Sequence, residues 1–145
     1  MSSKFSQFMR ENKLAQPNLF YAPTASLLDE NGEPLKWEFR RISSEQNSRL
    51  RDECLINEPN PKNPKAFIRT LKTAKYFEKM IVASTVFPDL YDSGLQDSYG
   101  VNTPEKLLYA LVDDPGEFDR LVRFVQQLNG MDESFGDKID QAKNS

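Results

Sequence analysis

The sequence predicts an α+β fold that is mostly helical, in which an N-terminal β-hairpin packs on a bundle of about four to five helices. Three observations lead to this fold class. Apolar residues recur at helical spacing behind clear helix-start patterns in the second half of the chain. An Asn-Gly turn lies between two short runs in the first half, which is a strong hairpin pattern. No apolar run approaches the roughly 20 residues that a membrane-spanning helix needs, so a cytosolic protein is expected.

Residues 24–42 are predicted to form the β-hairpin, with Asn31 and Gly32 at its turn. Both residue types tolerate the positive φ angles of tight hairpin turns. Beyond the turn, apolar and charged residues alternate, as they do in a strand with one buried face. The residues that this alternation places on the buried face are Leu35, Trp37 and Phe39.

The middle of the chain is predicted to hold two helices separated by a loop. Ser43 or Ser44 can cap the first helix, which runs to about Leu55, and Gln46 completes a capping-box pattern with Ser43. The stretch 57–64 contains three prolines and is predicted to be a loop. From Pro64 a long helix is expected to reach about Val86 and to pack on Trp37 and Phe39. Its predicted buried residues are Phe67, Ile68, Leu71, Ala74, Phe77, Met80 and Ile81.

Further helices are predicted in the last third of the chain. Residues 89–100 offer only short helical turns, ended by Gly100 in a left-handed conformation. Thr103-Pro104-Glu105 and Asp114-Pro115-Gly116-Glu117 each combine a capping side chain, a proline in the first turn and a carboxylate, which is typical of helix starts. The second of these helices is predicted to end at Gly130.

Three regions follow from this pattern. Residues 1–23 form an N-terminal arm with a short amphipathic helix, residues 24–132 a single globular domain, and residues 133–145 a mobile polar tail. Both ends carry large apolar residues without an obvious core, and such segments commonly become ordered on binding. The resulting partner-binding candidates are Phe5, Phe8, Met9, Phe135 and Ile139.

The composition excludes many kinds of catalytic and metal site. The chain has no histidine, which removes serine-hydrolase triads, imidazole bases and most zinc sites. Cys54 is the single cysteine and lacks an imidazole to activate it. Neighbouring carboxylates occur at 113–114 and 132–133, where helix ends favour a capping role. We therefore predict no catalytic residue, no metal and no cofactor.

Charge is distributed unevenly along the chain. Residues 1–75 carry 13 Lys and Arg against 9 Asp and Glu, whereas residues 76–145 carry 6 against 13. Such polarity favours head-to-tail association or an oppositely charged partner. In the predicted helix from Pro64, five basic residues share one face, namely Lys65, Arg69, Lys72, Lys75 and Lys79. A solvated face is the preferred interpretation over phosphate binding, because no aromatic residue interleaves with this stripe.

Several segments carry a resemblance to a known family over about residues 26–132. The segments are LDENGEPLKWEFR at 28–40, ASTVFPDL at 83–90 and LQDSYGV at 95–101, followed in order by shorter matches at 104–108, 115–118 and 128–132. In these segments the sequence resembles the XkdN-like phage tail assembly chaperones. The motif residues, for which structural roles are expected, are Trp37, Pro88, Asp89, Leu95, Gln96, Asp97, Tyr99 and Gly100.

The resemblance implies a non-enzymatic role in virion morphogenesis. Such chaperones are thought to coat the long helical tape-measure protein in the cytoplasm of the bacterial host, to keep it soluble, and to hand over to tail-tube subunits. Self-association is a further expectation, whereas nucleic acid and membranes are not expected partners. The alternative is a small phage regulatory or nucleic-acid-binding protein that uses the basic Lys65 to Lys79 face. For the motif segment 88–101, we expect buried Leu90, Leu95 and Tyr99, with Asp97 capping backbone amides.

Overall fold

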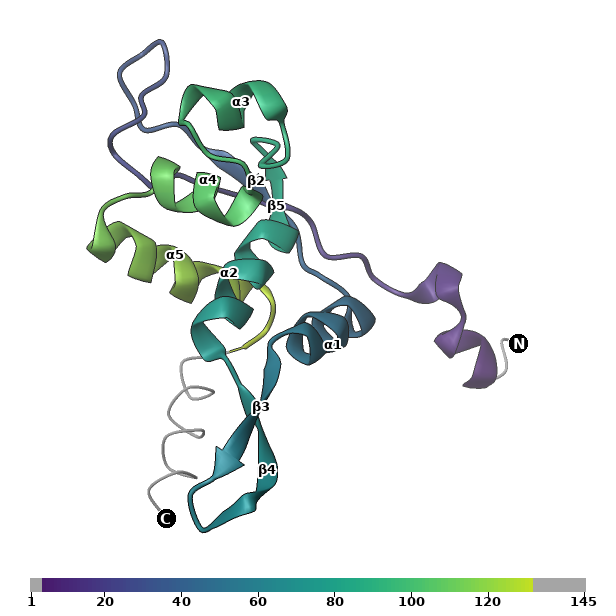
Figure 1. The fold of residues 1–145 in the computed structure, drawn as a ribbon. Coiled ribbons are helices and arrows are strands. Elements are labelled where there is room, and N and C mark those ends of the chain that lie inside the picture. Colours follow the sequence, from purple (N-terminus) through teal and green to yellow (C-terminus); the bar gives the residue numbers. More distant parts are fainter. Residues whose placement is uncertain (1–3, 132–145) are drawn as a thin grey trace.

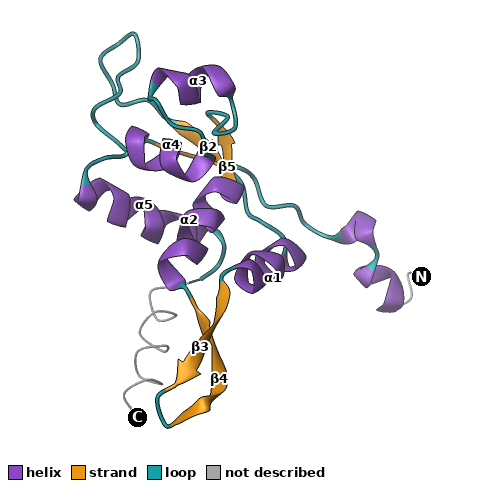
Figure 2. Ribbon diagram, viewed as in Figure 1, coloured by secondary structure: helices purple, strands orange, loops and turns teal. Residues whose placement is uncertain are grey.

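The computed structural model describes residues 4–131 as a helical body with two projections (Figure 1). The helices are α1 (Ser44–Glu53), α2 (Thr73–Ser84), α3 (Ser93–Ser98), α4 (Pro104–Leu111) and α5 (Pro115–Leu128). The strands are β1 (Leu19–Tyr21), β2 (Trp37–Phe39), β3 (Leu55–Asn60), β4 (Asn63–Leu71) and β5 (Thr85–Phe87). The predicted α+β, mostly helical fold class is confirmed (Figure 2).

Three helices begin where the sequence predicts. The side chains of Ser43, Thr103 and Asp114 cap α1, α4 and α5, and each accepts a hydrogen bond from the amide three residues on. These caps satisfy backbone donors that the first turn of a helix leaves free. The predicted stops at Gly100 and Gly130 also hold, because both adopt positive φ, at 68° and 76°.

The β-hairpin predicted for residues 24–42 is only partly present. Its turn forms, since Gly32 has a φ of 78° and the amide of Leu35 donates to the carbonyl of Leu27. The strand β2, however, pairs antiparallel with β1 on one side and β5 on the other. The expected buried Leu35 is 40% exposed. The three-stranded sheet is thus assembled from segments far apart in sequence.

The largest correction concerns residues 55–86. The predicted loop at 57–64 and the first half of the predicted helix from Pro64 form an antiparallel hairpin, in which β3 pairs with β4. Pro61 and Lys62 make its two-residue turn, and the amide of Lys62 donates to the Asn60 side chain. Strands of a two-stranded ribbon each have one unpaired edge, and proline is tolerated there. The expected helix is therefore confined to α2, and β5 occupies its predicted end.

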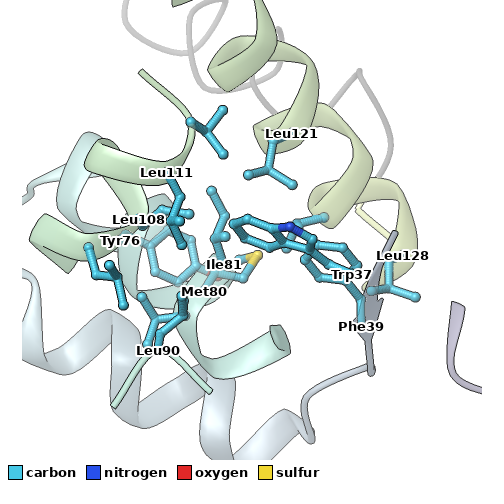
Figure 3. Packing of buried hydrophobic residues seen from close by; sticks show 14 of the residues in the cluster. Trp37, Phe39, Tyr76, Met80, Ile81, Leu90, Leu108, Leu111, Leu121 and Leu128 are labelled. Carbon is cyan, nitrogen blue, oxygen red and sulfur yellow. The ribbon is translucent and has the colours of Figure 1, made fainter. Parts of the chain in front are cut away.

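The core gathers around α2 (Figure 3). Trp37 and Phe39 are 2% and 0% exposed, so their expected burial is confirmed, and they lie in the same cluster as Met80 and Ile81 of α2. Phe39 also contacts Phe124 of α5 edge to face, with ring centroids 5.3 Å apart. The remaining fully enclosed apolar side chains come mainly from α4 and α5, namely Leu107, Leu108, Leu121 and Val125.

Asn129 fixes the C-terminal end of α5 to the rest of the body. Its side-chain oxygen accepts the amide of Ile42 at 2.9 Å, and its nitrogen donates to the hydroxyl of Ser84 at 3.1 Å and to the carbonyl of Val125 at 3.0 Å. Ser84 is fully buried at the end of α2. One amide side chain thus connects α2, α5 and the segment that follows β2.

Candidate partner-binding surfaces

The candidate sites in the described part of the chain are exposed surfaces and a pocket. Within residues 4–131, no group of three or more His, Cys, Asp or Glu side chains is placed to hold a metal ion. Cys54 is buried, and this burial raises the pKa of its thiol above the usual value. A buried thiol with a raised pKa is a poor nucleophile. The candidates are therefore two projections, one motif segment and one pocket.

The N-terminal arm is the first candidate surface. The expected short amphipathic helix is instead two 3₁₀ turns, η1 (Lys4–Phe8) and η2 (Arg10–Asn12). The arm runs away from the helical body (Figure 1). Large apolar side chains are strongly exposed along it: Phe5 81%, Phe8 87%, Met9 55% and Leu14 88%. The other two predicted partner residues, Phe135 and Ile139, lie outside the described residues.

The motif segment 88–101 is organised by its own side chains. Asp89 accepts the amide of Tyr91, and Asp92 caps α3 by accepting the amide of Leu95 at 2.8 Å. The side chain of Gln96 donates to the carbonyl of Leu90 at 2.8 Å, and Leu90 is 2% exposed. These contacts shape a turn that leads from β5 into α4.

Two expectations for this segment are corrected. The backbone amides are capped by Asp89 and Asp92, not by the carboxylate of Asp97, because the bend before α3 places the acceptors one turn earlier. Tyr99 is 38% exposed rather than buried, since it sits at the C-terminal cap of α3. Leu95 is half-buried against the core, and Pro88 precedes the turn after β5.

The β3–β4 hairpin carries a second projecting surface. Side chains alternate across a strand, so Lys65, Phe67 and Arg69 share one face of β4, and all three are exposed, Phe67 at 69%. We call these three residues the basic hairpin face. The predicted stripe on a single helix face is wrong, because Lys65 and Arg69 lie on β4 whereas Lys75 and Lys79 lie on α2.

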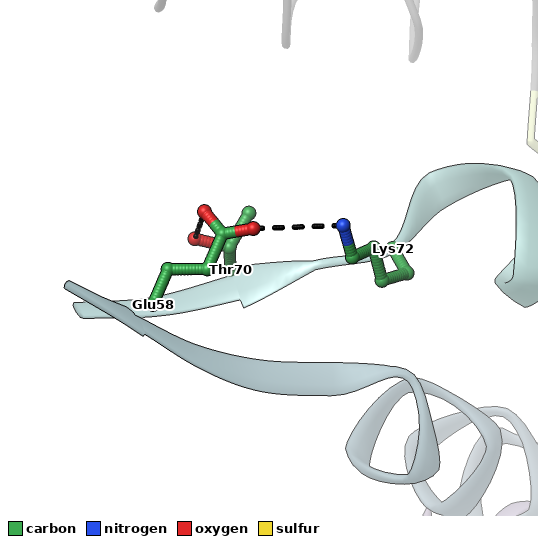
Figure 4. A network of polar contacts seen from close by, with 3 residues as sticks. All are labelled: Glu58, Thr70 and Lys72. Carbon is green, nitrogen blue, oxygen red and sulfur yellow. Dashed lines mark hydrogen bonds and ion pairs between the residues drawn. The ribbon is translucent and has the colours of Figure 1, made fainter. Parts of the chain in front are cut away.

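On the opposite face of the hairpin, the charges of Glu58 and Lys72 offset each other. Glu58 of β3 accepts a hydrogen bond from the hydroxyl of Thr70 at 3.2 Å and pairs with the ammonium of Lys72 at 3.5 Å (Figure 4). Within residues 4–131, no such ion pair involves the side chains of Lys65 or Arg69. The positive charge of the hairpin is therefore concentrated on its basic face.

An apolar pocket with acidic residues lies at the turn between α4 and α5. Its volume is about 300 Å³, and its apolar wall consists of Tyr109, Val112, Pro115 and Phe118. The rings of Tyr109 and Phe118 are stacked, with centroids 4.6 Å apart and an interplanar angle of 6°. The other lining residues are Asp113, Asp114 and Asp119. We call this site the acidic pocket.

Tyr109 stays neutral in the acidic pocket at physiological pH. Burial, together with a hydrogen bond to the carboxylate of Glu78, raises the pKa of Tyr109 to about 12. The residue keeps 45% of its surface exposed, and its hydroxyl is hydrogen-bonded to Glu78. The ring face remains available to a ligand, and the negative charge at the pocket comes from carboxylates alone.

Sequence reasoning missed both of these surfaces for identifiable reasons. The basic hairpin face was visible as a period-two alternation of Lys65, Phe67 and Arg69, but the same residues also fit a helical spacing. The stacking of Tyr109 on Phe118 depends on how α4 meets α5 in space. No spacing along the chain specifies that angle.

The fold and these surfaces define a small α+β domain, in whose described residues no group of three or more His, Cys, Asp or Glu side chains is placed to hold a metal ion. The sequence matches the family described as "Phage XkdN-like tail assembly chaperone protein, TAC" over residues 5–143. The chain therefore belongs to this family of phage tail assembly chaperones. Within the described residues, no helix is long and apolar enough to cross a membrane.

A sequence comparison and a structure comparison both find similarity to the protein YqbN. The chain is 23% identical over 117 residues to the uncharacterized protein YqbN of Bacillus subtilis (strain 168), which covers 81% of this chain and 77% of that protein. The crystal structure of the protein YqbN superimposes with a TM-score of 0.73 at 17% identity, over 91% of this chain and 100% of that one. This likeness establishes the shared fold.

Proposed function

We propose that this protein binds the tape-measure protein during phage tail morphogenesis and keeps it soluble until tail-tube subunits replace it. The site of action is the cytoplasm of the bacterial host, and the role is non-enzymatic. Membership of the tail assembly chaperone family supports the proposal at the level of tail proteins in general. The exposed apolar side chains of the N-terminal arm are the observation that supports the tape-measure protein as the specific partner.

The arm suits a long helical client because of its chemistry. Phe5, Phe8 and Leu14 are each more than four-fifths exposed, which is costly for a surface that stays in water. An amphipathic helix binds through rows of apolar anchors on a complementary apolar surface. A tape-measure helix that is not yet enclosed by the tail tube presents such rows, so the arm and the client can cover each other.

The experiment is co-expression of the tape-measure protein with the chaperone, followed by measurement of soluble tape-measure protein and of its recovery with the chaperone. Phe5→Ala/Phe8→Ala and deletion of residues 1–13 are expected to reduce both quantities. The matched control is Leu28→Ala/Tyr91→Ala, because these residues are also exposed, at 55% and 69%, but lie on the body. Unchanged melting temperatures would show that the domain remains folded.

Comparison of the arm variants with the control shows whether the arm, rather than another exposed surface, binds the tape-measure protein. Loss of tape-measure recovery in the arm variants, with full recovery in the control, supports the proposal. Full recovery in both arm variants removes the arm from the mechanism. Phe135→Ala/Ile139→Ala tests the predicted contribution of the C-terminal residues in the same assay.

The nucleic-acid alternative loses the geometry on which it was based. It required five basic residues on one helix face, whereas the structure places two on β4, two on α2 and Lys72 between these elements. The net charge of −3 and the sequence pI of about 5.1 also disfavour a general phosphate-binding role.

A further inference from the structure

We propose that this protein self-associates head to tail, with the basic hairpin face of one copy seated in the acidic pocket of the next. The contact is separate from tape-measure binding, because it uses neither the N-terminal arm nor the C-terminal residues. Its basis is the complementarity of two surfaces that one chain carries at two different places.

The basic hairpin face presents a ring between two cations. Phe67 is 69% exposed, and Lys65 and Arg69 follow the same face of β4 on either side, each about 7 Å along the strand. Glu58 does not neutralise them, because its carboxylate pairs with Lys72. Aromatic residues and arginine are enriched at protein interfaces.

The acidic pocket offers the opposite arrangement. Its stacked rings, Tyr109 and Phe118, form an apolar wall that can receive one aromatic side chain. Residues 113–120 contain four carboxylates and one guanidinium, that of Arg120. The ring of Phe67 in the cavity would bring Lys65 and Arg69 to these carboxylates, so that each surface covers what the other leaves exposed.

The two surfaces belong to different copies because one chain cannot join them. The hairpin projects from one end of the body, and the α4–α5 turn lies on the body, away from the hairpin tip (Figure 1). The two strands are paired along the length of the hairpin, from Leu55 and Leu71 at its base to Asn60 and Asn63 at its tip. A contact between two unlike surfaces repeats from copy to copy, which yields a ring or an open chain.

A second copy fits better than a nucleic acid. Single-stranded nucleic acids need a cationic groove and several stacking rings, whereas this face carries one exposed ring, Phe67, and two cations. The protein as a whole is acidic, with a net charge of −3. The acidic pocket supplies the complementary charge within the same molecule.

The experiment is sedimentation velocity of the full chain over a dilution series, in low and high salt. Two charge reversals are compared, Lys65→Glu/Arg69→Glu on the hairpin and Asp113→Lys/Asp119→Lys at the pocket. Asp114 is left intact because it caps α5. The matched controls are Lys36→Glu/Arg123→Glu and Glu30→Lys/Glu33→Lys, which change the net charge equally at exposed positions elsewhere. Phe67→Ala completes the set.

The expected pattern is specific to a head-to-tail contact. The wild type and both controls form species above the monomer that shrink in high salt, because exposed charge pairs are screened. Each reversal alone leaves a monomer, and Phe67→Ala weakens association about tenfold. Mixing the two reversed proteins restores longer species in which the two variants alternate, because the wild-type pair and the charge-reversed pair of surfaces are both complementary. Combining all four substitutions in one chain restores longer species.

Three results would overturn the proposal. The first is a wild type that stays monomeric throughout the series in low salt. The second is association that survives either reversal, which would show that the hairpin and the pocket are not partners. The third is binding of a labelled oligothymidylate that Lys65→Glu/Arg69→Glu abolishes while self-association persists, which would assign the face to nucleic acid.

Discussion

The α4–α5 end of the molecule and the β3–β4 hairpin are opposite in construction. Leu107, Leu108 and Leu121 are fully buried beneath the helical end, and the surface above them is hollow and acidic. No residue of β3 or β4 is buried, and one face of β4 is exposed and basic. The buried side chains of the helical end stabilise the fold, whereas the exposed side chains of the hairpin are available to bind a partner.

This contrast has an energetic meaning. A two-stranded ribbon alone is marginally stable in water, so the hairpin depends on its attachment to α1 and α2 rather than on a core of its own. The helical end contributes buried apolar area, which is the main stabilising term of a domain. Substitutions should therefore be severe in the core, moderate at the caps that position the helices, and mild on the hairpin.

The largest effect is expected for Trp37→Ala. The ring is 2% exposed within the core, and removal of a buried aromatic side chain costs about 3 to 5 kcal/mol through lost burial and a residual cavity. Urea unfolding monitored by circular dichroism measures the loss. In the wild type, the fluorescence emission of Trp37 should shift to longer wavelength on unfolding. A folded protein with the emission of a water-exposed indole would contradict this placement.

Asn129→Ala is expected to cost about 2 kcal/mol. The substitution leaves the amide of Ile42 and the hydroxyl of the buried Ser84 without this partner. Chemical denaturation provides the free energy of unfolding. Asn129→Asp is the informative companion, since its carboxylate can still accept from Ile42 but cannot donate to Ser84. Equal stability of both variants and the wild type would mean that this connection between α2 and α5 is dispensable.

Removal of a helix cap should have a smaller effect. In Asp114→Ala, the amide of Glu117 loses the carboxylate that accepts it at 2.9 Å, and loss of such a cap costs about 1 kcal/mol. Thr103→Ala at the start of α4 is the parallel case, with its acceptor 3.1 Å from the amide of Lys106. Asp114→Asn retains an acceptor and should recover most of the lost stability. Thermal unfolding of the wild type and the three variants, measured side by side, gives the order of their stabilities.

The same local chemistry explains how much of the fold was predictable. The starts of α1, α4 and α5 depend on contacts within three or four residues. The sequence around Ser43, Thr103 and Asp114 is therefore enough to predict them. The three-stranded sheet depends on strands that are distant in sequence, because Glu38 pairs with Phe20 on one side and Phe87 on the other. No short-range pattern contains that information.

The hairpin was mispredicted because two patterns compete in the same residues. Phe67, Ile68 and Leu71 fit a helical stripe, whereas Asn60-Pro61-Lys62-Asn63 places proline where a β-turn favours it. The turn determines the structure, and the apolar residues of β4 remain largely exposed. The arm side chains Phe5 and Phe8 were found from sequence because they lacked a core, which is also why they are candidates for a partner.

Tyr109 makes stability at the helical end sensitive to high pH. Its folded-state pKa is about 12, above the ordinary value of 10.0. The resulting contribution is fully present below pH 10 and is lost as the pH rises through about 12, because ionisation is disfavoured only in the folded protein. The stability difference between wild type and Tyr109→Phe should be constant below pH 10 and change between pH 10 and 12, as measured by denaturation at each pH. A constant difference over the whole range would contradict the raised pKa.

The smallest effect on folding is expected for Phe67→Ala. The ring is 69% exposed, and Phe67 is not among the residues packed against the core, so the free energy of unfolding should change by no more than about 0.5 kcal/mol. Unfolding should be measured in high salt, where self-association is suppressed, so that folding alone is compared. Ile68→Ala on the other face, at 42% exposure, is the matched control and should behave similarly. A loss above 1 kcal/mol confined to Phe67→Ala would place this ring among the residues that hold the fold and remove it from those free to bind a partner.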